Sequence, residues 1–231
     1  MTALSLVSKG DLAFLCEPAG GGSASVAVDV SEQRTSITDN TTYCSEANSA
    51  RTAIAAPRTI CVVVDMTTGS SGFLVHHGTS AVAYKYAISK SGTNIRLSEN
   101  AAVILTVAVP GLAAAARKFL IHWAQRPDGA FNFNECVIYN FTTAAWVFGS
   151  VTATAITPVS TDTFTIGATT TGTSAYSLGM TAFYTVAVGR RFHSTTESVI
   201  DHVAVPTPPS MPGRRRTPRI TGASTDLTIA G

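Results

Sequence analysis

The chain has 231 residues, of which 45% are hydrophobic and only 13% are charged, and its formal net charge is +2. This composition supplies enough apolar material for a packed core and excludes an intrinsically disordered chain. The small net charge gives no reason to expect nucleic-acid binding. The scarcity of charge leaves a Thr- and Ser-rich surface, which is typical of a protein that packs against neighbours or, alternatively, simply of a Thr-rich β-sheet.

The sequence contains no segment that predicts secretion or membrane insertion. Residues 1–9 have neither a basic segment nor a long apolar run, so we expect no signal peptide. The apolar stretch 101–116 is interrupted by Pro110 and Gly111, which makes it a poor transmembrane helix. A product made in the cytoplasm is the resulting expectation.

The first half of the chain predicts short strands separated by turns. Residues 24–30 alternate between apolar and polar, and a polar stretch at 31–49 predicts a long surface loop with at most one short strand. The segment 59–66 is apolar on both faces, which indicates a central strand. Further strands of this half are expected at 4–7, 11–16, 72–75, 82–88, 94–97 and 102–109.

The second half repeats this pattern and then changes. Phe119, Ile121 and Trp123 fall on one face of a strand at 117–125. Ser194 and Glu197 have the spacing of a capping box for a short helix that ends near residue 203. The other strands expected here are 136–141, 163–166 and 181–188.

Five sequence features of the second half occur together in chain order: Ile121-His122-Trp123, Val137-Ile138-Tyr139-Asn140, Ile166-Gly167, the Gly-led strand from 179 to 188, and the Arg turn that precedes Ser194. As a set they resemble the C-terminal half of the laminin-G-like, concanavalin A-like jelly rolls found in virion proteins of tailed bacteriophages. This resemblance implies an all-β, antiparallel β-sandwich. Asn140 is followed by Phe141 where that family usually has Gly, so the resemblance implies the architecture and not a shared binding site.

The C-terminal residues differ in composition from the rest. We expect a jelly-roll domain over residues 1–204 and an extended arm over 205–231, because the run 206–213 holds four prolines that fix φ and remove hydrogen-bond donors. Contact with a neighbouring molecule is expected to order this arm. The arginines predicted to dock the arm on its partner are Arg214, Arg215, Arg216 and Arg219.

The sequence predicts no enzyme. A glucanase of related fold would carry a Glu-x-Asp-x-x-Glu strand, whereas Asp65 stands alone in its strand and Glu135 has no acidic partner nearby. His122 lies close to no nucleophile pattern. The expectation is therefore a protein without catalytic residues.

No metal or other cofactor is predicted either. His76 and His77 would point to opposite faces of a strand, so a polar pair beside a turn is favoured over a metal site. The oxygen-rich stretch 128–135 fits a hairpin turn better than a calcium loop. Buried, unpaired thiols are favoured for the cysteines, with a Cys16–Cys44 disulfide as the alternative; they are Cys16, Cys44, Cys61 and Cys136.

Two aromatic residues are candidates for stacking against a sugar, namely Trp146 and Tyr176, with burial in the core as the alternative for each. The leading hypothesis is a non-enzymatic structural virion protein of a tailed bacteriophage, a minor tail or tail-tip protein. Its partners would be other virion proteins and copies of itself, with a host cell-surface glycan as a further partner. The alternatives are a capsid decoration protein and a free carbohydrate-binding, lectin-like module.

Overall fold

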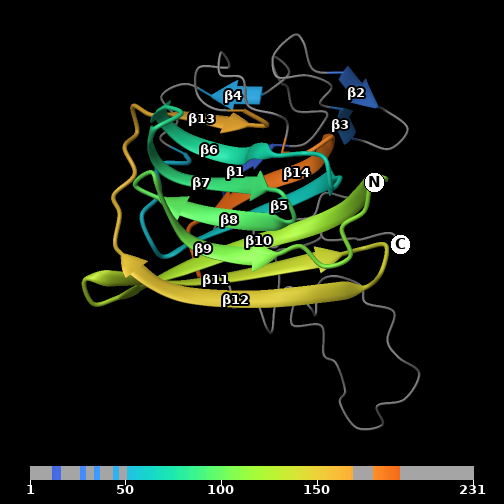
Figure 1. The fold of residues 1–231 in the computed structure, drawn as a ribbon. Helices are drawn as coiled ribbons and strands as arrows, with labels where there is room; N and C mark the ends of the chain where they lie inside the picture. Colours follow the sequence, from blue (N-terminus) through green and yellow to red (C-terminus); the bar gives the residue numbers. More distant parts are fainter. Residues whose placement is uncertain are drawn as a thin grey trace, which may run out of the picture.

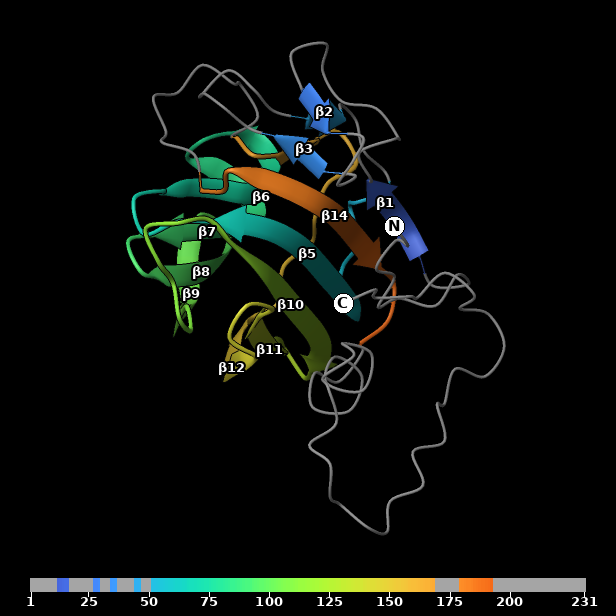
Figure 2. The same cartoon turned by 90° about the vertical axis from the view of Figure 1, so that its right-hand side faces the viewer.

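The computed structural model describes residues 12–16, 27–29, 34–36, 44–46, 51–168 and 179–192. All regular structure in these ranges is β-strand, arranged in two antiparallel sheets that face each other (Figures 1 and 2). The predicted antiparallel β-sandwich is confirmed. The predicted helix near 194–203, the arm over 205–231 and the cysteine pair Cys16 and Cys44 lie outside the residues whose side chains are described.

The larger sheet has eight strands. Its order is β12-β11-β10-β5-β14-β3-β2, and β1 also pairs with β14. The bounds are β1 Leu12–Cys16, β2 Ala27–Asp29, β3 Arg34–Ser36, β5 Arg58–Met66, β10 Arg117–Asp128, β11 Phe131–Asn140, β12 Ala145–Thr154 and β14 Ala182–Gly189.

The smaller sheet has six strands in the order β4-β13-β6-β7-β8-β9. Here β6, β7, β8 and β9 follow one another as consecutive hairpins, while β13 returns from later in the chain to pair with β6. The bounds are β4 Cys44–Glu46, β6 Gly72–Ser80, β7 Ala83–Ser91, β8 Asn94–Glu99, β9 Ala102–Ala108 and β13 Thr163–Ile166.

The core fills the space between the two sheets. Every residue of β5 is buried, and the strand lies between β10 and β14, which confirms the central position predicted from its apolar sequence. Trp123 from the larger sheet meets Tyr86 from the smaller one edge to face, with ring centroids 6.3 Å apart. Strands β9 and β12 lie at the same side of the sandwich, and Leu105 and Val107 of β9 pack over Gly149 of β12.

The structure differs from the sequence predictions at three places. The stretch 31–49 contains two short strands, β3 and β4, because each finds a partner in a different sheet. Strand β12 was not predicted, since Ala145, Gly149 and Ala153 weaken its β-propensity and pairing with β11 supplies the missing stabilisation. The hairpin turn predicted within 128–135 joins β10 to β11, but it is shorter than that stretch because β11 already begins at Phe131.

Candidate functional site

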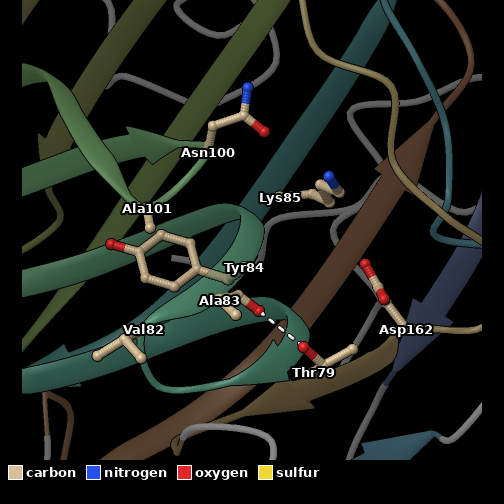
Figure 3. A pocket seen from close by; sticks show the side chains of 8 residues that line it. All are labelled: Thr79, Val82, Ala83, Tyr84, Lys85, Asn100, Ala101 and Asp162. Carbon is tan, nitrogen blue, oxygen red and sulfur yellow. Dashed lines mark hydrogen bonds between the residues drawn. The ribbon is translucent and has the colours of Figure 1, made fainter.

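A pocket of about 410 Å³ opens at one end of the smaller sheet (Figure 3). The β6–β7 hairpin forms one wall, the β8–β9 turn forms another, and Asp162 comes from the segment that precedes β13. Such a volume matches ligand sites for small molecules. The lining residues are Thr79, Val82, Ala83, Tyr84, Lys85, Asn100, Ala101 and Asp162.

Local hydrogen bonds fix the β6–β7 hairpin. The Thr79 hydroxyl donates to the Ala83 carbonyl at 3.3 Å, and the Ala83 N–H donates to the Ser80 hydroxyl at 3.1 Å. Val82 at the tip is 78% exposed. The bonds hold the backbone of the hairpin while its apolar tip faces solvent at the rim of the pocket.

The β8–β9 turn places Asn100 at the pocket. Asn100 and Ala101 both have left-handed backbone conformations, with φ of 46° and 60°. Two such residues form a tight hairpin turn, and Asn tolerates this conformation better than most residues because its side chain can hydrogen-bond locally. The Asn100 N–H donates to the Lys85 carbonyl at 2.9 Å, which fixes the turn against β7.

Four pocket residues carry chemistry suited to a polar ligand. Figure 3 shows the Tyr84 ring on one side of the pocket and Asp162 on the other, with Lys85 and Asn100 between them. The Tyr84 ring packs edge to face against the Phe73 ring, with the two ring centroids 5.8 Å apart. Lys85 forms no ion pair with any carboxylate in the described ranges. The site thus offers a carboxylate acceptor, an amide, an ammonium donor and an aromatic ring.

Asp162 links the pocket to a layer of buried side chains between the two sheets. The layer consists of His77, Tyr86, Arg58, Glu99, Trp123, Gln125 and Asn134. Its Oδ2 lies 3.9 Å from Nδ1 of His77, and both side chains are almost fully buried. His77 stacks on Tyr86 with ring centroids 4.8 Å apart and planes within 1° of parallel. Burial, followed by the positive charge of Arg58, lowers the pKa of His77 to about 4. The imidazole is therefore neutral at pH 7, and Asp162 keeps its capacity to accept hydrogen bonds from a ligand.

The same buried layer also fixes the turn that carries Asn100. The guanidinium carbon of Arg58 lies 4.1 Å from the Tyr86 ring centroid, and an Arg58 nitrogen lies 3.2 Å from Oε1 of Glu99, the residue directly before Asn100. Burial raises the pKa of Glu99, and the charge of Arg58 opposes that shift. The ion pair anchors the end of β8 at the turn that carries Asn100.

The layer continues into the larger sheet. The Gln125 amide donates to Glu99, and it also donates to Oδ1 of Asn134 at 2.5 Å. The Trp123 indole N–H donates to the same Asn134 oxygen at 2.9 Å. Arg58, Trp123, Gln125 and Asn134 thus tie the larger sheet to the pocket of the smaller sheet.

The residues predicted to bind partners are not part of this pocket. Trp146 lies on β12 and is 50% exposed, so it is not a core residue. The other predicted residues lie outside the described ranges: Tyr176, Arg214, Arg215, Arg216 and Arg219.

The histidine pair lies within a strand and not beside a turn, which corrects the sequence prediction. Strand β6 continues to Ser80, and both imidazoles are buried. His77 faces the core, while His76 contacts Phe73 and Tyr84. Within the part of the chain that the structure describes, no group of three or more metal-ligating side chains comes together.

Sequence reasoning did not identify Tyr84, Lys85, Asn100 or Asp162. Tyr84 and Lys85 lie on β7 and Asn100 directly follows β8, whereas Asp162 comes from a segment much later in the chain. The residues meet because β13, β6, β7 and β8 are neighbours in one sheet. An Asn directly after a strand is a signal of a left-handed turn residue, and this signal could have located Asn100.

No helix in the described ranges is long and apolar enough to cross a membrane.

No family model matches the sequence, and no curated protein matches it. The fold is similar to solved structures of other proteins, and three of them are described by sequence identity, coverage and TM-score. The heptameric SAP-like pentraxin from Limulus polyphemus is 13% identical over 61% of this chain and 67% of that chain, with a TM-score of 0.40.

The binding domain of botulinum neurotoxin DC, solved in complex with SialylT, is 7% identical, with a TM-score of 0.49. The match covers 81% of this chain and 45% of that chain. Arcelin-5, a lectin-like defense protein from Phaseolus vulgaris, is 10% identical over 78% of this chain and 92% of that chain, with a TM-score of 0.38. Similarity at these values assigns no function to this chain, whose sandwich follows from its own strand pairing.

Proposed function

We propose that this protein is a non-enzymatic carbohydrate-binding module and that its ligand occupies the pocket beside the β6–β7 hairpin. The observation that supports the proposal is the combination of Tyr84, Asn100 and Asp162 around one pocket of about 410 Å³. A sugar ring has apolar C–H faces and a rim of hydroxyl groups, so it needs an aromatic surface together with directed polar groups.

Each polar group has a distinct role in this proposal. The Asp162 carboxylate accepts hydrogen bonds from sugar hydroxyls, and charged acceptors form the stronger bonds. The Asn100 amide both donates and accepts, and Lys85 donates to ring or hydroxyl oxygens. Because Asp162 is only 5% exposed, its bonds to a ligand would form in a partly desolvated environment, where they are stronger than in water.

The proposal includes binding without hydrolysis. Glycoside hydrolysis commonly uses two carboxyl groups about 5–10 Å apart on either side of the scissile bond. Asp162 is the one carboxylate among the residues that line the pocket. Incubation with the bound glycan should therefore release no new reducing ends.

A glycan array followed by titration calorimetry tests the proposal with the full chain. Asp162→Asn and Asn100→Gly should each weaken binding of the best glycan about tenfold or more, since each removes a polar group at the site. Glycine suits the left-handed backbone at Asn100, so the turn should persist. Thr106→Ala, on the exposed side of β9, is the control that should bind normally. Binding that is unaffected by both pocket variants would refute the site.

The role in a bacteriophage particle stays a prediction from the sequence. It rests on the Thr-rich surface and on the arm over 205–231, which lies outside the described residues. If the arm docks on a neighbouring virion protein, proteases should cut it in the purified chain but not in the intact particle. Equal cleavage in both would contradict this role.

A further inference from the structure

Strand β12 forms an open edge of the larger sheet. It is ten residues long, it pairs with β11 in an unbroken register, and no strand in the described ranges pairs with its other side (Figure 1). Its side chains alternate between partly buried and exposed along its whole length. Trp146 and Phe148 are 50% and 39% exposed on the same face.

The hydrogen-bond pattern shows which backbone groups are available at this edge. The Ala155 N–H donates to the Ala130 carbonyl at 3.3 Å, and these two residues continue the register in which Thr154 faces Phe131. Hydrogen-bonded pairs alternate along an antiparallel ladder, so this bond fixes the phase of all of β12. The residues that direct their N–H and C=O groups away from β11 are Trp146, Phe148, Ser150, Thr152 and Thr154.

This edge lacks the features that keep open edges monomeric. Natural sheets protect an edge with charged side chains, proline, a β-bulge or a short strand. The sequence Ala145–Thr154 contains no charged residue and no proline, and its pairing with β11 shows no bulge. An uncharged edge also offers no charge complementarity to an acidic or basic peptide, which leaves an uncharged strand as the matching partner.

We propose that β12 pairs antiparallel with β12 of a second copy of this chain, about a two-fold axis at Ser150. In this register Ser150 faces its own copy, Phe148 faces the partner's Thr152, and Trp146 faces the partner's Thr154. Every outward-directed backbone group of the edge then finds a partner, giving about ten hydrogen bonds, two for each of five pairs. The Trp146 and Phe148 rings lie beside threonine methyl groups, a favourable cross-strand pairing. The larger sheets of the two copies become one continuous sheet.

Cysteine cross-linking tests the register in the full chain. In Ser150→Cys the two Cα atoms would lie about 5.5 Å apart, within the range of a disulfide, so mild oxidation should link the dimer covalently. Thr152→Cys is the matched control on the same strand. Its two copies would be offset by about 13 Å along the ladder, and it should stay unlinked. An equal mixture of Phe148→Cys and Thr152→Cys should link, and the wild-type chain should not.

Sedimentation equilibrium tests the interface without cysteines. Ser150→Lys places two ammonium groups opposite each other and should raise the dimer dissociation constant by about tenfold at low salt. Ala108→Lys, on the exposed edge strand β9 of the smaller sheet, should leave the dimer dissociation constant unchanged.

Three results would overturn the proposal. One is a wild-type chain that stays monomeric at about 100 μM while Ser150→Cys fails to link. Another is a dimer that Ser150→Lys does not weaken. The third is a monomer in which a soluble polysaccharide changes the fluorescence of Trp146, because this face would then bind glycan; Trp123, the second tryptophan of the chain, is buried.

Discussion

Arg58 of β5 and Glu99 of β8 form an ion pair between the two sheets, with 3.2 Å between the guanidinium nitrogen and the carboxylate oxygen and with both side chains at most 2% exposed. Arg58 also donates to the Ile54 carbonyl at 3.1 Å and lies over the Tyr86 ring. Removal of one partner would leave a buried charge without compensation, which is far more costly than loss of a pair at the surface.

Replacement of Glu99 by Leu should therefore lower the free energy of unfolding by about 3–5 kcal/mol. The double variant Arg58→Met with Glu99→Leu should recover most of that loss, because it buries no charge. Urea unfolding followed by fluorescence of the buried Trp123 measures both effects. The Arg51–Glu46 pair is the matched control, since Arg51 is 61% exposed, and Arg51→Ala should cost less than about 1 kcal/mol. A double variant no more stable than Glu99→Leu alone would contradict this account.

The two histidines of β6 predict a loss of stability in mild acid. Burial lowers the pKa of both His76 and His77 to about 4, whereas the unfolded chain titrates near the ordinary value of 6.5. Between these values the unfolded state binds more protons, so the stabilising effect is complete above about pH 6.5 and is lost as the pH falls towards 4. The loss should reach about 3 kcal/mol for each histidine.

Urea unfolding at pH 7.5 and pH 5 measures this loss, and His77→Phe is the informative comparison. Phenylalanine keeps a ring beside Tyr86 but cannot bind a proton, so this variant should lose less stability between the two pH values than the wild type does. Burial raises the pKa of Glu99, which has the opposite effect on stability but contributes to both proteins. Equal pH dependence of the two proteins would rule out His77 as a source of the acid sensitivity.

The alternation of apolar and polar residues predicted most of the strands and the sandwich, because a period of two encodes which face of a strand is buried. Strand β5 was predicted by a different signal, a continuous apolar run, and all nine of its residues are buried. Strand β12 was missed because its stability depends on pairing with β11, which lies earlier in the chain. The two strands form a hairpin, and the propensity of β12 alone does not report the stabilisation that this pairing supplies.

The candidate site could not be predicted in the same way. Tyr84, Asn100 and Asp162 have no common spacing in sequence, and they meet only because the smaller sheet brings β7, β8 and the segment before β13 to one end of the sandwich. Local patterns identified the histidines of β6 but not their partners. His77 pairs with Tyr86 across the β6–β7 register, and it lies near Asp162, which directly precedes β13.

Gly78 is predicted to be essential for the shape of the pocket. A Cβ atom added there would lie 2.4 Å from the Cα of Tyr84 and 2.6 Å from the carbonyl oxygen of Ala83, so backbone atoms would have to move. Gly78→Ala should lower the free energy of unfolding by about 1–3 kcal/mol and weaken glycan binding as well. Gly69→Ala is the control, because nothing lies within 4 Å of its added Cβ and its cost should be within about 0.5 kcal/mol. Equal stability of the two variants would contradict the close approach of β7 to Gly78.

Cys61 and Cys136 should be unreactive in the folded protein. Both thiols are buried and unpaired, and burial raises the pKa of Cys136 to about 12 and that of Cys61 further. In a chain with Cys16→Ser and Cys44→Ser, a disulfide reagent at pH 8 should modify these two thiols only as fast as the protein unfolds, because thiolate formation requires solvent. Addition of Thr106→Cys, on the exposed side of β9, to that chain supplies an exposed thiol that should react at once. Reaction of Cys61 or Cys136 at the rate of this exposed thiol, under conditions where the fold persists, would show that the two sheets open locally around β5 and β11 without global unfolding.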